Sequence, residues 1–450
     1  MALEVIILAA GQGVRMKSEL AKVLHPLGGK PMLQHVIDTA QSLQPVVCHV
    51  VIGHAAEQVR ETLAQPGIHW VEQERQQGTG HAVRQALPAV NPDHDVLVLY
   101  GDVPLIGRDS LQSLLSQPLP ALLTAVLEEP SQLGRIVRGD NHEFLEVVEY
   151  ADASEAQREL TEINSGVLAA TARQLENWLP RLGNDNRQAE YYLPQVLSLA
   201  RQDGLAVSTV RAGSAAEVLG VNDLVELNRV EREYQLRLAT GLMRQGVSLA
   251  DARRLDIRGS LSAGSGVYID ANVVFEGEVL LGDQVHIGPN CFLRNVQLGA
   301  GVRVEAFSHL EGASVAAGCE IGPYARLRPG AQLAANATVG NFVEITQSDI
   351  GPGSKIKHLT YVGNSELGSR VNIGAGTITC NYDGAGKHQT RIGDDAFIGS
   401  NATLVAPVSV EDGAFVGAGS TVTSKVGKDE LALGRAKQRN IRGWKRPKPE

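Results

Sequence analysis

The chain has 450 residues, a formal net charge of −9 and 4% aromatic residues. This length predicts two or three domains, and an acidic balance with few aromatic residues excludes a broad nucleic-acid surface. The four cysteines are scattered without a CxxC pair, which disfavours a disulfide framework and a zinc site.

The N-terminus, MALEVIILAAGQG, has a short apolar run without a basic n-region or a small-residue cleavage pattern. We therefore interpret it as a buried strand and not as a signal peptide. No apolar run reaches the length of a membrane span. We expect a cytoplasmic protein that binds neither membranes nor nucleic acids.

Residues 1–222 alternate apolar runs with helical segments. EVIILAA, VVCHVVIG and HDVLVLYGD read as buried strands, and residues 31–43, 81–87 and 109–115 as helices. This alternation predicts an α/β domain of the doubly wound, Rossmann-like class with a mostly parallel sheet. Ligands of such sheets bind beyond the carboxyl ends of the strands.

Two of these strand ends carry candidate chemistry. After the first strand, residues 11–16 resemble GxGxxG, but Met16 stands in place of the third glycine and no P-loop Lys-Ser/Thr follows. A glycine-rich turn alone is a weak signal, although Arg15 and Lys22 close by would suit a triphosphate. The second strand end is Asp102, at the end of the apolar run HDVLVLYGD. A carboxylate at this place suits Mg²⁺, or else it caps a helix or turn.

Residues 223–254 have an apolar residue at every third or fourth position, which predicts one long connecting helix. Beyond it, aliphatic residues recur every six residues, with occasional steps of five. They are Ile269, Phe275, Leu281, Ile287, Leu293, Leu298, Val304, Leu310, Val315, Ile321, Leu327, Leu333, Val339, Ile345, Ile350, Ile356, Val362, Leu367, Ile373, Ile392, Ile398, Leu404, Val410, Val416 and Val422. A period of six predicts a parallel β-helix over residues 255–426, in which these side chains form the core.

The period is interrupted between Thr379 and Arg391, where CNYDGAGKHQT predicts a loop ejected from the β-helix. Residues 427–450 form a basic tail. It is either a solvated terminus or an anion-binding segment.

Several motifs together resemble a known family. LAAGQGVRM, KVLHPLGGKPML, EQERQQGTGHAV, LYGDVPLI and EINSGV are similar to the sugar nucleotidyltransferases. GPYARLRPG, VGNFVEI, KHLTYVGN, NIGAGTITCNYDG and GWKRP extend the similarity. The whole chain resembles the bacterial bifunctional enzymes that act as UDP-N-acetylglucosamine pyrophosphorylase and glucosamine-1-phosphate N-acetyltransferase. The resemblance implies a left-handed β-helix and a homotrimer.

For residues 1–222 the resemblance implies uridylyl transfer from UTP to N-acetylglucosamine 1-phosphate, with pyrophosphate as the second product. Asp102 and Asn222 would bind Mg²⁺, and Arg15 and Lys22 would contact the phosphates. The whole implied nucleotide and nucleotide-sugar set is Leu8, Ala9, Ala10, Gly11, Arg15, Lys22, Gln73, Gly78, Thr79, Tyr100, Gly101, Asp102, Gly134, Glu149, Asn164 and Asn222.

For the β-helix the resemblance implies acetyl transfer from acetyl-CoA to the amine of glucosamine 1-phosphate. His358 is the candidate base, because imidazoles titrate near neutral pH. The chain has 12 histidines, and a histidine in a protein is most often a surface or core residue without a catalytic role. Acceptor binding would involve Arg328, Glu344, Tyr361 and Asn372, and acetyl-CoA binding Ala375, Asn381, Tyr382, Ser400, Ala418 and Arg435. The product would feed peptidoglycan and lipopolysaccharide precursors.

The chain departs from the family pattern at two positions. Ala21 replaces the proline of the family's PKVL segment, where we expect only a local change in stiffness. Thr346 replaces a lysine that helps hold the acceptor phosphate, which predicts weaker binding of glucosamine 1-phosphate. Lys355 and Lys357 are the residues able to compensate.

Three other functions fit parts of the sequence. The β-helix of a sugar nucleotidyltransferase can serve oligomerisation or regulation only. A trimeric scaffold that senses nucleotide-sugars would need no catalysis. A bifunctional enzyme that uses another sugar would keep both sites.

Overall fold

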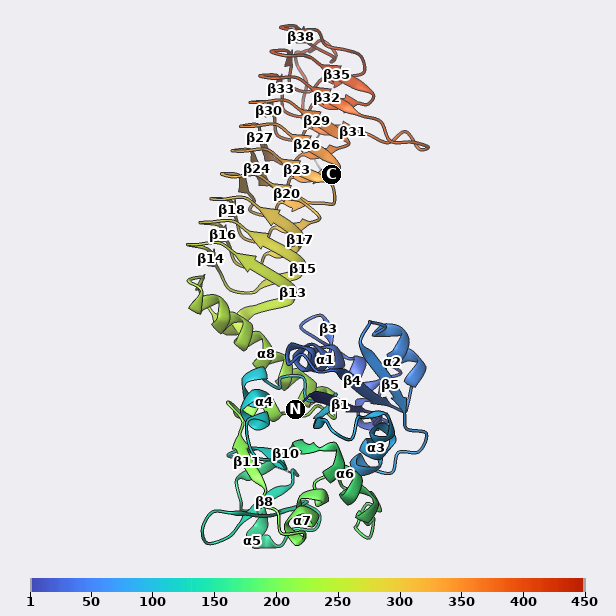
Figure 1. Ribbon diagram of the computed structural model, residues 1–450. Helices are drawn as coiled ribbons and strands as arrows, with labels where there is room; N and C mark the ends of the chain where they lie inside the picture. The colour runs from blue at the N-terminus through green and yellow to red at the C-terminus, as the bar shows by residue number, and fades with distance from the viewer. Residues whose placement is uncertain (1, 131, 448–450) are drawn as a thin grey trace. The chain divides into compact units, whose positions relative to one another are not determined.

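The computed structural model describes residues 2–130 and 132–447. The chain forms two compact units, residues 1–234 and 235–450, and their helices and strands are labelled in Figure 1. The boundary falls inside helix α8 (Leu224–Arg244), in the segment expected to connect the two domains. Among the described residues, no helix combines the length and apolar character needed to cross a membrane.

A nine-stranded sheet forms the centre of unit 1, in the order β11–β7–β10–β6–β1–β4–β5, with the β8–β9 hairpin attached to β10. The strands are β1 (Leu3–Ala9), β4 (Val47–Ile52), β5 (Ile68–Glu72), β6 (Asp95–Tyr100), β7 (Ala121–Val126), β8 (Arg135–Arg138), β9 (Phe144–Val148), β10 (Glu162–Thr171) and β11 (Ser208–Arg211). A separate two-stranded ribbon joins β2 (Pro26–Leu27) and β3 (Lys30–Pro31).

The expected mostly parallel sheet is in fact mixed. Strands β6, β1, β4 and β5 are parallel, as is the β7–β11 pair, but β10 runs antiparallel to both β6 and β7. Between β7 and β10 the described residues form the β8–β9 hairpin and the one-turn helix α5 (Glu155–Arg158). β10 inserts between β6 and β7, and mixed sheets are common among large sheets.

Two apolar clusters bury the two faces of the sheet. On β1, Val5 and Ile7 belong to one cluster, and Ile6 and Leu8 belong to the other. This explains why the strand is apolar at consecutive positions. The helices of the unit are α1 (Met32–Ser42), α2 (Ala56–Thr62), α3 (Thr79–Ala86), α4 (Arg108–Leu115), α6 (Ala172–Trp178) and α7 (Gln195–Gln202).

The long helix α8 is shorter than the sequence pattern predicts. It ends at Arg244 instead of Arg254, and the chain enters β12 (Ser248–Leu249) four residues later. Gly246 has φ of 96°, a conformation that glycine adopts at low cost and that ends helices. β12 pairs with β14, so the β-helix begins at residue 248 and not at 255.

Unit 2 is a parallel β-helix, whose stacked coils are visible in Figure 1. One sheet runs along the whole stack. It contains β12, β14 (Tyr268–Ile269), β16 (His286–Ile287), β18 (Arg303–Val304), β21 (Glu320–Ile321), β24 (Thr338–Asn341), β27 (Lys355–His358), β30 (Asn372–Ile373), β33 (Phe397–Ile398), β36 (Phe415–Val416) and β38 (Leu431–Ala432).

The other strands form one 16-stranded sheet that turns a corner at β17 (Phe292–Leu298), next to β13 (Leu255–Ala263) and β15 (Val273–Leu281). One arm contains β20 (Ser314–Val315), β23 (Ala331–Leu333), β26 (Ser348–Ile350), β29 (Ser365–Leu367), β32 (Thr390–Ile392) and β35 (Val408–Val410). The other contains β19 (His309–Glu311), β22 (Arg326–Leu327), β25 (Glu344–Thr346), β28 (Tyr361–Gly363), β31 (Ile378–Cys380), β34 (Thr403–Val405) and β37 (Thr421–Val422).

The six-residue pattern predicted the core of this unit. Every aliphatic or aromatic residue assigned to the period from Ile269 to Val422 is at most 5% exposed, and all of them belong to one cluster. The stack extends beyond the expected end at residue 426, because Leu431 and Ala432 pair with Phe415 and Val416 in β36. The ejected loop lies between β31 and β32, where Figure 1 shows it projecting from the coils.

Candidate active sites

The first candidate site lies at the carboxyl edge of the parallel strands in unit 1. Leu8 of β1 pairs with Tyr100 of β6, and the Gly101 N–H donates to the Leu8 carbonyl at 2.9 Å. The register therefore places the glycine-rich turn after β1 next to Asp102, which follows β6. This is the position at which open α/β sheets bind ligands.

A cavity of about 360 Å³ opens at this edge. Nine of the residues expected to contact nucleotide or nucleotide-sugar line it, namely Leu8, Ala10, Gly11, Gln73, Gly78, Thr79, Tyr100, Asp102 and Asn222. Leu8 and Asn222, the first and last of them in the sequence, are more than 200 residues apart, so the fold brings the set together.

The side chain of Lys22 joins the two expected metal ligands. Its Nζ lies 2.5 Å from Asp102 Oδ2 and donates to Asn222 Oδ1 at 3.0 Å. The backbone also links this pair, because the Val221 N–H donates to the Asp102 carbonyl at 2.9 Å. Two oxygens from distant segments thus converge on one positive charge.

A second group of expected residues lies beside the Tyr100 ring. The Asn164 N–H donates to the Gly134 carbonyl at 2.9 Å, and Asn164 Oδ1 accepts from the Gly166 N–H at 2.9 Å. Gly166 must lack a side chain, because a Cβ there would lie 2.6 Å from the Tyr100 ring. Burial raises the pKa of the Tyr100 phenol, which therefore stays protonated at neutral pH.

Glu149 completes this group. A Cβ on Gly134 would lie 3.1 Å from Glu149 Oε1, so the glycine leaves room for the carboxylate. Burial raises the pKa of the Glu149 carboxyl, and the nearby Asp152 raises it further.

The three remaining expected residues lie outside the cavity lining, and three residues of the lining were not predicted from the sequence. Arg15 is exposed in the short helix after the glycine turn, and it lies outside the cavity lining, as do Ala9 and Gly101. The missed lining residues are Gln76, Ala82 and Glu190. Gln76 and Ala82 lie inside the EQERQQGTGHAV motif, whereas Glu190 has no recognisable local signal.

The second candidate site lies at a corner of the β-helix. Arg326, Glu344 and Tyr361 are in register on successive coils of β22, β25 and β28. Arg328 donates from Nη1 to Glu344 Oε1 at 2.9 Å, and Arg326 Nη1 lies 3.8 Å from Glu344 Oε2. Glu344 is therefore held by two arginines, of which the sequence analysis identified one.

His358 lies at the end of β27, next to this corner. Its Nδ1 is 2.8 Å from Asn341 Oδ1 on the preceding coil. An amide oxygen can only accept, so Nδ1 carries the proton and Nε2 keeps its lone pair. The structure thus orients His358 through Asn341 and not through Glu344. Asn341 lies within the VGNFVEI motif but was not singled out.

The expected acetyl-CoA residues stack along the next coils. The Gly376 N–H donates to the His358 carbonyl at 3.3 Å, which places Ala375 one coil after His358. The Asn401 N–H then donates to the Ala375 carbonyl, and the Gly419 N–H to the Ser400 carbonyl, both at 2.8 Å. Ala375, Ser400 and Ala418 form one column, and Arg435 Nη1 donates to the Ala418 carbonyl at 2.5 Å.

The ejected loop and Asn372 flank the corner. Asn372 lies in β30, in register with Lys355 of β27. Asn381 is buried and donates from Nδ2 to Asn364 Oδ1 at 2.6 Å, whereas Tyr382 is exposed, with its hydroxyl donating to the Gly384 carbonyl at 2.7 Å. The base of the loop is therefore fixed to the coil below, while its tip faces solvent.

Thr346 is buried in β25, with 7% of its surface exposed. Its carbonyl accepts from Ser348 Oγ at 2.8 Å and from the Asn364 N–H at 3.2 Å. It lies two residues after Glu344 and so on the same face of the strand.

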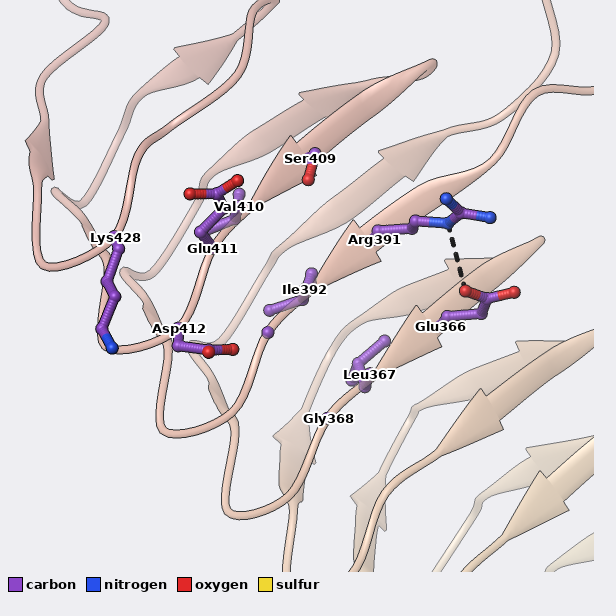
Figure 2. Close-up of a pocket in the computed structure, with 11 residues that line it drawn as sticks. Glu366, Leu367, Gly368, Arg391, Ile392, Ser409, Val410, Glu411, Asp412 and Lys428 are labelled. Carbon is purple, nitrogen blue, oxygen red and sulfur yellow. Dashed lines mark ion pairs between the residues drawn. The ribbon is translucent and has the colours of Figure 1, made fainter.

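A larger hollow, of about 620 Å³, lies on a different edge of the β-helix and is drawn in Figure 2. Its described lining includes the Glu366–Arg391 ion pair, with 3.1 Å between Oε2 and Nε, and none of the acetyltransfer candidates. In a single chain His358 and Tyr382 are exposed, so the candidate acetyl site is open to solvent.

Comparison with known proteins identifies the class of both units. The model of the MobA-like NTP transferase domain matches residues 5–167, and that of the hexapeptide repeat of succinyl-transferase matches residues 389–424. Curated proteins called bifunctional protein GlmU match over 99% of both chains. They include those of Pseudomonas putida strain GB-1, at 53% identity over 450 residues, Stutzerimonas stutzeri strain A1501, at 54% over 450, and Marinobacter nauticus, at 52% over 449.

Proposed function

The chain belongs to the family of bifunctional GlmU proteins, and on that premise we propose that its two units catalyse consecutive reactions. Unit 2 acetylates glucosamine 1-phosphate with acetyl-CoA. Unit 1 then transfers UMP from UTP to the resulting N-acetylglucosamine 1-phosphate and releases pyrophosphate. The single observation that best supports the second reaction is the convergence of Asp102 and Asn222 on one cation beside the nucleotide-sized cavity.

In unit 1 a phosphate oxygen of the sugar phosphate attacks the α-phosphorus of UTP. Both reactants are anions, so the barrier is largely electrostatic and positioning is the main task of the protein. The backbone at Gly11 and the side chains of Arg15 and Lys22 bind the phosphates. Gln73 and Thr79 contact the base, whereas Glu149 and Asn164 hold the sugar.

Asp102 and Asn222 fit a bound Mg²⁺. Both offer oxygen ligands, which this ion prefers, and they already face one positive charge at hydrogen-bonding distance. When bound, Mg²⁺ neutralises charge on the phosphate oxygens around the transferred group. The backbone bond between Val221 and Asp102 keeps the two ligands in place.

In unit 2 His358 accepts a proton at Nε2 from the ammonium group of glucosamine 1-phosphate. The freed amine attacks the thioester carbonyl of acetyl-CoA, the CoA thiolate leaves, and the proton that the nitrogen loses converts the thiolate into the free thiol. Arg328 binds the acceptor phosphate, Tyr361 and Asn372 contact the sugar, and Ala375, Ser400, Ala418 and Arg435 bind acetyl-CoA together with Asn381 and Tyr382.

The open acetyl corner supports a homotrimer in which neighbouring β-helices complete each site. We place the enzyme in the cytoplasm, where UTP and acetyl-CoA are formed. The product supplies precursors of peptidoglycan and lipopolysaccharide.

A coupled assay tests the proposal. Purified protein receives glucosamine 1-phosphate, acetyl-CoA, UTP and Mg²⁺, while free CoA thiol and pyrophosphate are followed separately. We expect both products. His358→Ala should abolish CoA release and keep pyrophosphate formation from added N-acetylglucosamine 1-phosphate. If wild type releases no CoA thiol and forms pyrophosphate only when N-acetylglucosamine 1-phosphate is added, the β-helix is confined to oligomerisation or regulation.

A further inference from the structure

The contact of Lys22 with both Asp102 and Asn222 has a consequence for the order of binding. Lys22 Nζ occupies the space between Asp102 Oδ2 and Asn222 Oδ1, at 2.5 Å and 3.0 Å from them. These two oxygens are the proposed Mg²⁺ ligands, and Mg²⁺ needs oxygens at about 2.0–2.1 Å. An ammonium group and a divalent cation cannot both lie between the same pair of oxygens.

Hydrogen bonds hold the backbone of both proposed ligand residues. The Val221 N–H holds the Asp102 carbonyl at 2.9 Å, and the Asn222 N–H donates to Glu226 Oε2 at 2.6 Å. Lys22, in contrast, reaches the site through a flexible four-carbon stem. The lysine head is thus the part that must move when a metal ion binds.

The lysine stem also contacts the glycine-rich turn. Gly13 has φ of 63°, and a Cβ on it would lie 2.6 Å from Lys22 Cβ. The turn that faces the phosphates therefore packs directly on the stem of Lys22. An ammonium released from Asp102 has the phosphates of a bound nucleotide as its nearest alternative anions.

We propose that the Lys22 ammonium occupies the cation position while the site is free of nucleotide. When the metal ion binds, the ammonium moves from Asp102 and Asn222 to the triphosphate of the bound nucleotide. Metal binding and phosphate binding are thereby coupled through one side chain. The free enzyme binds divalent cations weakly, because each ion must displace the ammonium. This inference rests on the proposed metal site, and its test separates the two.

The test measures Mn²⁺ binding to the full-length protein without nucleotide, by the electron paramagnetic resonance signal of free Mn²⁺. Lys22→Met and Lys22→Gln remove the ammonium, and we expect each to bind Mn²⁺ about 5-fold or more tightly than wild type. The matched control is Lys17→Met, which removes an exposed charge from the same segment. We expect its affinity to stay within about twofold of wild type, since a change of net charge alone acts weakly through solvent.

Asp102→Asn decides between the two possible failures. If Asp102→Asn loses Mn²⁺ but both Lys22 variants bind like wild type or more weakly, the displacement by Lys22 is wrong and the metal site stands. If Asp102→Asn binds Mn²⁺ like wild type, the metal site is wrong, and the inference with it. Circular dichroism and thermal unfolding of the same preparations check that unit 1, which holds these residues, is folded in each variant. If one of the two neutral Lys22 variants is not folded, the other gives the test.

Discussion

His358 and Asn341 occupy successive coils of the β-helix and are joined by a 2.8 Å contact between Nδ1 and Oδ1. The bond fixes both the ring orientation and the tautomer of the proposed base. A general base contributes about 10²–10⁴-fold to the rate, and part of this depends on its orientation. We therefore expect Asn341→Ala to lower kcat of acetyl transfer by about 10-fold or more, with a smaller effect than His358→Ala.

The control for this prediction is pyrophosphate formation by the same variant, which should be unchanged. Asn341→Ser, which keeps an oxygen but shortens the side chain, should recover little activity. An Asn341→Ala enzyme with wild-type kcat would show that the contact does not orient the base.

The second prediction concerns stability and pH in unit 1. Glu4 is buried and accepts from His49 Nε2 at 2.6 Å, His94 Nδ1 at 2.7 Å and the Asn91 N–H at 3.0 Å. Burial alone would raise the pKa of Glu4, but these donors outweigh it and lower the pKa below 4.5. Because the pKa is lower in the folded state, the stabilisation is complete above the unfolded value and is lost as the pH falls through the folded value.

Glu4→Gln should thus reduce the free energy of unfolding at pH 7 by about 1–3 kcal/mol, since it weakens charge-assisted hydrogen bonds at a buried site. Chemical denaturation at pH 7 and at lower pH measures this difference, which should shrink as the pH drops below 4.5. Glu72→Gln is a suitable control, because Glu72 is exposed and its ion pair with Arg60 is 3.6 Å long. An equal loss in both variants would contradict the prediction.

The third prediction concerns Ala21, the position at which the family pattern of the sequence analysis has proline. Its φ of −53° suits proline, but its N–H donates to Gln58 Oε1 at 2.8 Å. Proline would reduce the entropy of the unfolded chain, worth about 0.4–1 kcal/mol, but it would remove a hydrogen bond worth about 0.5–1.5 kcal/mol. We therefore expect Ala21→Pro to be neutral or destabilising alone and stabilising in a Gln58→Ala background.

Thermal unfolding of the two single variants and the double variant gives the coupling between these sites. Additive effects would mean that the bond from Ala21 to Gln58 contributes nothing to stability.

The fourth prediction concerns Thr346, which occupies the place of a lysine in the family. It follows Glu344 by two residues and shares its face of β25, close to Arg328. A lysine there would add positive charge beside the acceptor phosphate. We expect Thr346→Lys to lower KM for glucosamine 1-phosphate several-fold and to leave KM for acetyl-CoA unchanged.

Steady-state kinetics with both substrates checks this, and Thr346→Met controls for side-chain size. An unchanged KM for glucosamine 1-phosphate would show that Arg328 and its neighbours already bind the phosphate fully.

The sequence predicted most of the fold because the spacing of its apolar residues matches the spacing of buried positions in the strands. The six-residue step from Ile269 to Val422 places each of those side chains in the core, and consecutive apolar residues such as Ile6 and Ile7 identified a strand buried on both faces. The end of α8 at Arg244 was missed, since apolar spacing alone continues past the turn at Gly246.

The candidate sites were only partly predictable, for a similar reason. Asp102 and Asn222 stand in recognisable motifs, but their convergence on Lys22 depends on how strands far apart in the chain align. Glu190 reaches the cavity from a loop whose own sequence carries no pattern. Gln58 contacts Ala21 from a helix 37 residues away, and local sequence holds no sign of this partner.

The column of Ala375, Ser400 and Ala418 rises by one coil at each step, with Arg435 at its end. Stacked strands are about 4.8 Å apart, so the column offers contacts at regular intervals to an extended ligand. The hydrophobic core would tolerate the insertion or removal of a whole coil, because each coil repeats the last. The column of ligand contacts would not tolerate this change, since Arg435 would then shift by the height of one coil relative to Ala375. If acetyl-CoA binds along this column as proposed, its length limits the number of coils between Ala375 and Arg435, a constraint that acts on the architecture of the repeat and not on any single side chain.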